Sequence, residues 1–371
     1  MSEFKVSSME SSTGGAPSFT QGLNVAGADV TSGHAMSEYY TGATEPSSPA
    51  NGAFWFDGTD IHQYINGKFR ILDVTGPPVW FGDRGLFDIG KARGTWPNVS
   101  VVNNIDYISI PTTGNASDFG DTTSASYSRS ACSNGSRGVF AGGNNLASID
   151  YVTIANTGNA TDFGDLTNTT ARSAACSNGI IGVIAGNSAV STLGTIMEYI
   201  TIATTGDATD FGDLTVGRYH LASCSSSSRG VFGGGSKTDH SNADNIDYIT
   251  IATASNATDF GDLTVSRAQL ASFSNGYRGV FGGGSASNNT IDYVTIATTG
   301  NATDFGDLVT GGTLLSGCAN ATRGVFGGGY YVSGTNKLQY ITINTTGNAT
   351  NFGNLAVTAE ATQDGSACSG G

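Results

Sequence analysis

The chain has 371 residues, a formal net charge of -14, 12% charged residues, 54 glycines and 7 prolines. Charged residues are about half as frequent as the roughly 25% of an ordinary soluble domain, and glycine is about twice its usual ~7%. With 16 Lys and Arg against 30 Asp and Glu, the composition argues against nucleic acid or an anionic membrane as a partner. No apolar run approaches the ~18 residues of a membrane span, so we expect a soluble, turn-rich protein.

Residues 1 to 35 are rich in Ser, Gly, Thr and Ala without an apolar period, which predicts a flexible N-terminal anchor. Residues 36 to 83 differ, because Asp57-Gly58 and Asn66-Gly67 separate three short aromatic or branched segments. Such dipeptides are strong hairpin signals. The segment is too small for a core of its own. We therefore expect a β-meander connector that packs on the rest of the chain or on a neighbouring subunit.

The connector carries the pattern Pro-x-x-Pro-x-x-Gly from Pro46, then Phe-Trp-Phe-Asp-Gly from Phe54, then Tyr-Ile-Asn-Gly-Lys-Phe from Tyr64. Over about 30 residues this pattern resembles segments of tail fibres and other virion proteins of bacteriophages. The resemblance implies a protein that is assembled in the host cytoplasm and is extracellular on the particle. It also implies attachment to other virion proteins through the N-terminal segment.

Residues 84 to 371 repeat four short motifs, and six copies of each occur if worn copies are counted. They are an Arg-Gly-Val-Phe-Gly-Gly motif, an Ile-Asp-Tyr tripeptide, an Asp-Phe-Gly-Asp-Leu motif and a Ser-Ala-Cys-Ser-Asn-Gly motif. Each phenylalanine of the third follows the tyrosine of the second by 12 residues. In this order the motifs are marked by Arg84, Arg137, Ile181, Arg229, Arg278 and Arg323; Tyr107, Tyr151, Tyr199, Tyr248, Tyr293 and Tyr340; Phe119, Phe163, Phe211, Phe260, Phe305 and Phe352; and Cys132, Cys176, Cys224, Phe273, Cys318 and Cys368.

Four strand-like segments in a unit of 44 to 49 residues match the four-stranded blade of a β-propeller. We name them a (around the cysteine), b (the Arg-Gly motif), c (from the tyrosine tripeptide) and d (the Asp-Phe-Gly motif). The first unit lacks strand a, and the final segment around Cys368 is a strand a without a following b. We therefore predict an all-β, six-bladed propeller over residues 84 to 371, closed by pairing of the C-terminal strand with the first strand b. In the alternative, Val79-Trp80-Phe81 supplies the first strand a and the tail is free.

The diglycine after strand b, the tyrosine, the later aromatic residue and an arginine before the next strand a resemble kelch-type propeller repeats across residues 84 to 371. Phenylalanine stands where kelch repeats usually have tryptophan, so the resemblance implies the architecture and not the partners of that family. The four histidines, at 34, 62, 220 and 240, are not paired at metal-ligand spacing, unlike those of a copper-radical oxidase on the same fold. The arginines of the pattern are Arg129, Arg172, Arg218 and Arg267.

In an antiparallel blade, the a–b and c–d turns lie on one face and the b–c and d–a connections on the other. The step from the b motif to the tyrosine is 23, 14, 18, 19, 15 and 17 residues, whereas the other steps are nearly constant. Insertions in repeat proteins gather on the binding face, although drift in loops that contact nothing would give the same pattern. The candidate binding residues for a glycan or protein epitope are Arg93, Trp96, Lys237, His240, Tyr330, Tyr331 and Lys337.

Two repeated motifs suggest ligands or modifications. Carboxylates such as those of Asp259-Phe260-Gly261-Asp262 could hold Ca²⁺, which needs six to eight oxygens, but Asx turns explain them without a cofactor. Asn-Ala-Thr matches the glycosylation sequon. Because Asp207 replaces the asparagine in one copy, a turn role in the c–d loop is the simpler interpretation. The asparagines are Asn159, Asn256, Asn301 and Asn348.

The five cysteines occupy one repeat position. Equivalent atoms on different blades are expected to exceed the ~7 Å Cα separation that a disulfide tolerates. We therefore expect small, buried apolar residues on strand a.

These features predict a phage virion structural protein, a tail fibre or other receptor-binding, adhesive component. Copies on one particle, as a homo-oligomer, would gain avidity for a host-surface glycan or protein. One alternative is capsid decoration or tail and baseplate assembly without recognition. Another is a glycan-acting enzyme or lectin on a propeller scaffold. The acidic residues are mostly bound to the repeat and no catalytic pair stands apart, so we expect no enzyme, and no membrane insertion.

Overall fold

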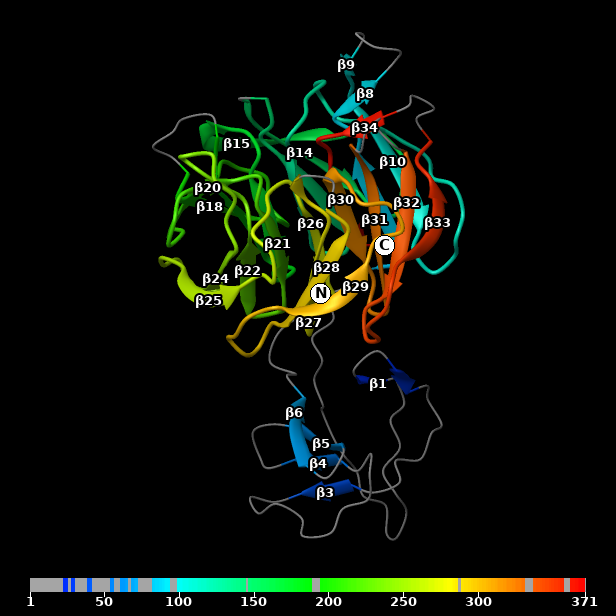
Figure 1. The fold of residues 1–371 in the computed structure, drawn as a ribbon, viewed down its shortest axis with the longest axis vertical. Helices are drawn as coiled ribbons and strands as arrows, with labels where there is room; N and C mark the ends of the chain where they lie inside the picture. The colour runs from blue at the N-terminus through cyan, green and yellow to red at the C-terminus, as the bar shows by residue number, and fades with distance from the viewer. Residues whose placement is uncertain are drawn as a thin grey trace. The chain divides into compact units, whose positions relative to one another are not determined.

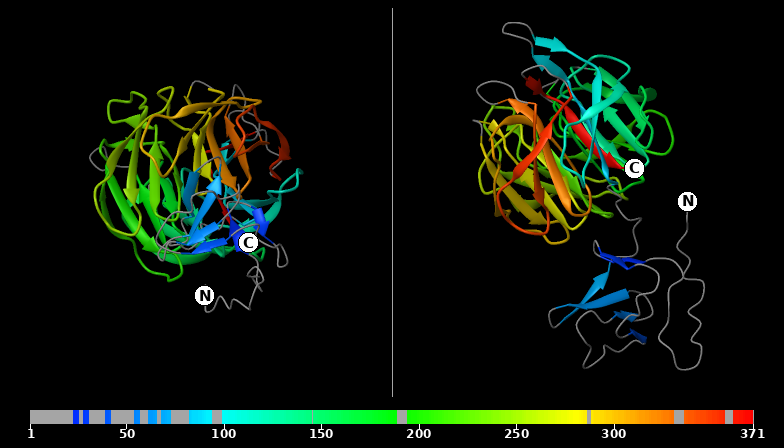
Figure 2. Two further views of the ribbon diagram at one scale, coloured as in Figure 1. Left: turned by 90° about the horizontal axis from the view of Figure 1, so that it is seen from below. Right: turned by 90° about the vertical axis from the view of Figure 1, so that its right-hand side faces the viewer.

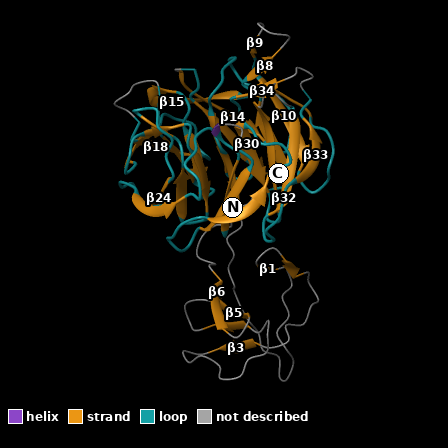
Figure 3. Cartoon of the chain, in the orientation of Figure 1, coloured by secondary structure: helices purple, strands orange, loops and turns teal. Residues whose placement is uncertain are grey.

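The computed structural model describes residues 82–93, 99–144, 146–188, 194–285, 288–330, 336–356 and 361–370, together with six short strands before residue 73. The chain divides into two compact units, Met1–Pro77 and Pro78–Gly371. Strands and the loops and turns between them make up nearly all of the described structure (Figure 3). The fold class is all-β, as the motifs predict.

In the first unit, the Asp-Gly and Asn-Gly signals lie between antiparallel strands, in agreement with the hairpins expected from them. The structure adds a parallel pair, β3 with β4, to the connector, and an antiparallel pair, β1 with β2, to the stretch expected to be a flexible anchor. In that antiparallel pair, Ala26-Gly27 separates two short segments that contain branched residues. The strands are β1 (Leu23–Val25) and β2 (Ala28–Val30), then one sheet in the order β3 (Tyr39–Thr41), β4 (Phe54–Phe56), β5 (Ile61–Ile65) and β6 (Lys68–Leu72).

The second unit contains six four-stranded antiparallel sheets arranged as a ring of blades (Figures 1 and 2). Each sheet has the strand order a, b, c, d. In that order the first three blades are β35 (Ser366–Gly370), β7 (Arg84–Asp88), β10 (Asn104–Ser109), β11 (Ser117–Asp121); β12 (Ser130–Ser133), β13 (Arg137–Ala141), β14 (Leu146–Thr153), β15 (Thr161–Thr170); and β16 (Ala174–Ser177), β17 (Ile181–Ala185), β18 (Ile196–Thr201), β19 (Thr209–Asp213). The other three are β21 (Ala222–Ser225), β22 (Arg229–Gly233), β24 (Asn245–Thr250), β25 (Thr258–Asp262); β26 (Ala271–Ser274), β27 (Arg278–Gly282), β28 (Thr290–Thr295), β29 (Thr303–Asp307); and β30 (Thr313–Ala319), β31 (Arg323–Tyr330), β32 (Lys337–Thr342), β33 (Thr350–Asn354).

The ring closes between its two ends. β35 pairs antiparallel with β7, with Ser366 opposite Asp88 and Gly370 opposite Arg84. This confirms the predicted closure. The place of the first strand a is taken by the C-terminal strand, so the alternative that assigned it to Val79-Trp80-Phe81, which lies outside the described residues, is wrong.

Cysteines and glycines of neighbouring blades fit together. All five cysteines are free and buried, as expected, and burial raises the pKa of Cys132 to about 12, so its thiol stays protonated. A side chain at Gly182, the glycine of the next blade's Arg-Gly position, would meet the Cys132 sulfur at 2.7 Å. Cys368 faces Gly138 in the same way, at 3.0 Å. The repeat therefore needs glycine in strand b because the preceding blade's cysteine occupies the space of a β-carbon.

The arginine that begins strand b packs on an aromatic pair of its own blade and donates a hydrogen bond to the next blade. Tyr107 and Phe119 stack edge to face with ring centroids 6.1 Å apart, and all six blades repeat this pair. The Arg84 guanidinium lies 4.8 Å above the Tyr107 ring and donates from Nη1 to the Ile154 carbonyl of the next blade, at 2.8 Å. Four other blades have the equivalent arginine bond. The third blade has Ile181 at this position and lacks it.

The repeated asparagine is a clamp between blades. Asn159 Oδ1 accepts the Asp121 N–H of the preceding blade at 3.1 Å, and all six blades have an equivalent bond, with Asp207 as the acceptor in one. Gly120 has φ +148°, and a side chain there would overlap the Gly158 carbonyl. The Asp-Phe-Gly glycine thus allows the neighbouring c–d turn to approach closely.

Candidate functional site

The six a strands line a narrow central channel with a volume of about 70 Å³. Serine hydroxyls join neighbouring strands around it, because each donates to a carbonyl of the preceding blade. The bonds run from Ser177 to Ser133 at 2.6 Å and from Ser225 to Ser177 at 2.7 Å. Ala319 stands where the remaining serine would be. Since the hydroxyls are already bonded, the channel itself offers few free polar groups.

A second ring lies where the chain enters the a strands, on the face shared by the b–c and d–a connections. Here the N–H of one blade's residue donates to the carbonyl of the equivalent residue in the preceding blade, from Arg172 to Ser128 at 3.0 Å and from His220 to Arg172 at 2.7 Å. The series continues through Gln269 and Leu314, and the Ser128 N–H donates to the Asp364 carbonyl. We call these residues the channel-mouth ring: Ser128, Arg172, His220, Gln269, Leu314 and Asp364.

All six residues of the channel-mouth ring have left-handed backbones, with φ between 56° and 63°. For a residue other than glycine this conformation costs roughly 1–2 kcal/mol. Among the described residues only eight non-glycine residues have positive φ, and the other two, Asn144 and His240, lie in b–c loops on the same face. Backbone strain concentrates at functional sites. The described residues include glycine at 22 other positive-φ positions, yet the ring has six different side chains, so we regard it as the candidate site.

The side chains of the ring differ in exposure and charge. Ser128 and Asp364 are buried, Arg172 is exposed, and the other three are half-buried. Lys91 Nζ lies 3.2 Å from Asp364 Oδ2. It also lies 3.4 Å from the centroid of the Tyr127 ring, a cation–π contact. The mouth therefore presents cations beside aromatic rings.

Aromatic and imidazole groups continue from Arg172. Its guanidinium lies 5.9 Å from the centroid of the Tyr219 ring, and the Tyr219 hydroxyl lies 2.7 Å from His240 Nδ1. Burial lowers the pKa of His220 to about 4, while the Asp364 carboxylate favours and the Arg172 and Lys91 charges oppose its protonation. His220 is therefore a neutral hydrogen-bonding group at neutral pH.

The structure brings one residue of the sequence-based candidate set to this mouth and places several others on the same face. His240 joins it through Tyr219, and Lys237 lies in β23 (Ser236–Lys237), which pairs with β20 (Arg218–Tyr219). Tyr330 ends β31, and Lys337 begins β32 with Nζ 3.1 Å from Asn354 Oδ1. Arg93 ends β8, and only its backbone is described, whereas Trp96 and Tyr331 lie outside the described residues.

The first b–c connection contains a hairpin that the sequence did not reveal. β8 (Lys91–Arg93) pairs with β9 (Val99–Val101) and with β34 (Ala361–Gln363), which precedes the closing strand. Figure 1 shows these three strands together at one end of the propeller. The pairing brings Lys91 to Asp364, so the longest b–c connection contributes a cation to the mouth.

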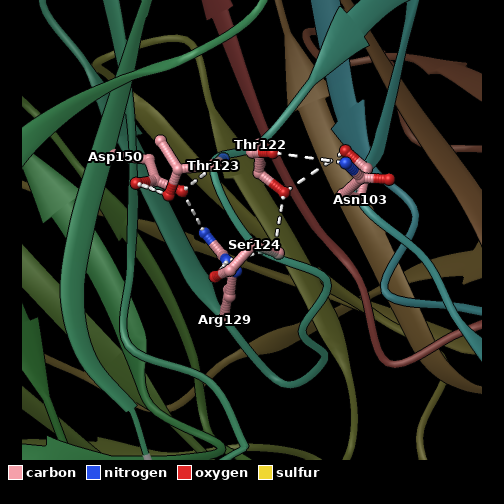
Figure 4. A network of polar contacts seen from close by, with 6 residues as sticks. All are labelled: Asn103, Thr122, Thr123, Ser124, Arg129 and Asp150. Carbon is pink, nitrogen blue, oxygen red and sulfur yellow. Dashed lines mark hydrogen bonds and ion pairs between the residues drawn. The ribbon is translucent and has the colours of Figure 1, made fainter.

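Three arginines before the a strands are buried in ion pairs, and Figure 4 shows the pair of Arg129 with Asp150. Arg129 Nη1 lies 2.8 Å from Asp150 Oδ2, and the Thr123 hydroxyl donates to Asp150 Oδ1 at 2.6 Å. Arg218 with Asp247 and Arg267 with Asp292 repeat the arrangement. Arg172 is the exception, because it lies four residues before its cysteine, which is the ring position. Arg129, Arg218 and Arg267 therefore have a structural role, whereas the side chain of Arg172 lies at the candidate site.

Three blades lack a buried arginine before strand a, and two of these carry a residue other than aspartate at the aspartate position. Gln339 accepts the Thr310 N–H at 2.9 Å and donates to the Thr310 carbonyl at 3.0 Å. Glu198 accepts from the Thr167 N–H at 3.0 Å and from its hydroxyl. Burial, the largest influence, raises the pKa of Glu198 to about 7, although the Thr167 N–H favours the ionised form.

Glu198→Gln should make folding stability less dependent on pH. The unfolded chain loses the Glu198 proton near pH 4.5 and the folded chain near pH 7, so the free energy of unfolding falls between these values and stays low above pH 7. The variant should remove on the order of 3 kcal/mol of this loss. Asp88, another buried carboxyl whose pKa burial raises to about 7, gives a slope of the same sign. The slope should therefore be reduced and not abolished.

Denaturant unfolding between pH 4 and pH 9 measures the effect. Gln339→Glu is the matched reverse change and should steepen the slope. Parallel curves for Glu198→Gln and the wild type would show that Glu198 ionises normally in the folded protein.

The Asp-Phe-Gly-Asp motifs lie on the outer strands. Asp259 is exposed and pairs in register with Asp247, which is already bonded to Arg218. Within the described parts of the propeller, no group of three or more His, Cys, Asp or Glu side chains is placed to hold a metal ion. The Ca²⁺ hypothesis therefore stays a prediction from the motif.

No protein-family model matches the chain, and no curated protein matches it. None of the described residues belongs to a helix with the length and apolar character that a membrane span requires. The architecture and the channel-mouth ring therefore carry the functional argument.

Proposed function

We propose that the protein is an adhesive, receptor-binding component of a bacteriophage virion. Its propeller, built from kelch-like repeats, recognises a host-surface glycan or protein on the face that contains the channel-mouth ring. Residues 1 to 83 attach it to other virion proteins, and several copies act together. The virion assignment is supported by the Pro-x-x-Pro, Phe-Trp-Phe-Asp-Gly and Tyr-Ile-Asn-Gly pattern of the connector. We propose no catalytic role.

One observation carries the recognition part. The blades repeat the same residues at their structural positions, yet the channel-mouth ring holds six different side chains on strained backbones. A position that needs only a left-handed backbone is best filled by glycine. Retaining serine, arginine, histidine, glutamine, leucine and aspartate there at a cost in stability is typical of a functional surface.

A triple variant of the full chain, Arg172→Gly, His220→Gly and Gln269→Gly, separates binding from folding. Because glycine relieves the strain, the melting temperature should be unchanged or higher. Binding of the fluorescently labelled chain to a panel of bacterial strains, measured by flow cytometry, should be lost. Strains that bind both proteins equally would exclude the ring as the recognition site. Failure of the wild type to bind any strain above the level of an unrelated β-protein would contradict receptor binding.

A second candidate is assembly on the particle without receptor recognition, with the same face against neighbouring subunits. It is favoured by exposed valines in three successive d–a connections, Val216 at 36%, Val265 at 44% and Val309 at 51% exposure. Immunogold electron microscopy of particles distinguishes the two. Antibodies raised against this face should label intact particles if it is displayed and fail to do so if it is covered.

A further inference from the structure

The side chains of Lys91 and Arg172 are two cations at the channel mouth, and Ser128 of the ring links them through backbone hydrogen bonds. The Arg172 N–H donates to the Ser128 carbonyl at 3.0 Å, and the Ser128 N–H in turn donates to the carbonyl of Asp364, the ion-pair partner of Lys91. Each cation lies against a tyrosine ring, Lys91 against Tyr127 and Arg172 against Tyr219. We call Lys91, Tyr127, Arg172, Tyr219 and His240 the cationic arc.

The arc stands out against the charge distribution of the propeller. All three lysines between residues 84 and 371, Lys91, Lys237 and Lys337, lie in or at the ends of b–c connections. Of the other propeller arginines whose side chains are described, three lie in buried ion pairs and five lie at the starts of b strands, on the opposite face. Among the described residues, no carboxylate lies within ion-pair distance of Arg172, whose side chain is exposed. In a protein of net charge -14, this face is the one that would attract an anion.

The neighbouring groups suit a hydroxylated ligand. His220 is neutral at neutral pH, so its imidazole both donates and accepts hydrogen bonds. Gln269 adds an amide, and the tyrosines add flat amphipathic faces. Only Leu314 is apolar in the ring, which is unlike the apolar centre of a protein–protein interface.

We infer that the cationic arc binds an anionic saccharide, with the carboxylate or phosphate of the sugar on the Arg172 guanidinium and a sugar ring beside Tyr219. Arginine matches both oxyanions with two parallel hydrogen bonds. Five backbone hydrogen bonds link the six residues in a row. At the ~4.8 Å spacing of hydrogen-bonded chains, six such positions around one axis form a ring about 10 Å across, which is enough for one or two sugar units. The inference rests on the proposed recognition by this face and names its ligand class.

The test uses the full chain and three polymer probes: oligogalacturonate for carboxylate, a glycerol-phosphate oligomer for phosphate, and dextran as the neutral polymer. At least one anionic probe should bind, more weakly as salt rises, and dextran should not. Glutamine is compatible with this backbone conformation, because Gln269 has it at the equivalent position of another blade. Arg172→Gln should therefore fold normally and weaken anion binding by about 10- to 100-fold. Tyr277→Ala, in the exposed a–b turn of the opposite face, should bind as the wild type does.

The two anionic probes identify the source of the charge. Equal binding of dextran, or anion binding that Arg172→Gln leaves unchanged, would overturn the ligand class while cell binding by the wild type still supports recognition. If all three probes fail but whole bacteria bind and the triple glycine variant does not, the ligand is not an anionic saccharide. Failure of cell binding as well would remove the proposed function.

Discussion

Removal of residues 361–371 is expected to open the propeller and to lower its melting temperature by about 10 °C or more. β35 supplies the pairing partner of β7, and its Ser369 hydroxyl donates to the Ala319 carbonyl while its carbonyl accepts from Ser133. Each of these hydrogen bonds contributes about 1 kcal/mol, and Cys368 also packs on Gly138. We therefore expect the free energy of unfolding to fall by at least about 5 kcal/mol. The exposed edge of β7 should also promote aggregation.

Thermal unfolding followed by circular dichroism measures this change. A synthetic peptide covering residues 361–371, added to the shortened chain, should restore part of the melting temperature, whereas a peptide with the same residues in scrambled order should not. An unchanged melting temperature in the shortened chain would mean that the closing strand contributes little to the ring.

Arg218→Met should lower the free energy of unfolding by about 3–5 kcal/mol, because it leaves the carboxylate of Asp247 buried without its cation. Arg218 also donates to the carbonyls of Gly234 and Asn245. Urea unfolding at pH 7 is the measurement. Adding Asp247→Asn to the variant should recover at least half of the loss, since the blade with Gln339 shows that an amide is accommodated at this position without an arginine.

The exposed Arg172 provides the matched control. Arg172→Gln removes a cation from the same group of arginines but leaves no buried charge, so the free energy of unfolding should change by less than about 0.5 kcal/mol. If Arg218→Met and Arg172→Gln lowered the free energy of unfolding equally, burial of the ion pair would not determine how much it contributes to stability.

The repeat and its closure could be predicted because they depend on residue types that recur at fixed spacing. The glycine opposite Cys132 and the asparagine that accepts the Asp121 N–H recur because every blade contacts the next in the same way. The variable b–c spacing likewise pointed to the face that carries the strained residues.

The channel-mouth ring could not be found by the same reasoning. Its members share a backbone conformation and no residue type, so no motif marks them, and the strain arises only when six strands converge on one axis. One signal was present: the position four residues before the centre of each strand a differs in every unit. Lys91 was missed because the pairing of β8 with β34 joins residues from opposite ends of the propeller.

The closing strand also sets the time at which the ring can form. β7 and β35 join positions as far apart as 84 and 370, and every other blade lies between them. At about 5–20 residues per second of synthesis, the inner edge of β7 waits roughly 15–55 s for its partner. During that interval five blades offer strands of nearly the same sequence as the correct one. Pairing of β7 with β35 closes a long loop and so costs more chain entropy than pairing of β7 with an a strand that is nearer in the sequence. The nearer a strands therefore compete with β35 for the edge of β7. The speed and fidelity of folding are therefore expected to depend on how well β35 is distinguished from the other a strands.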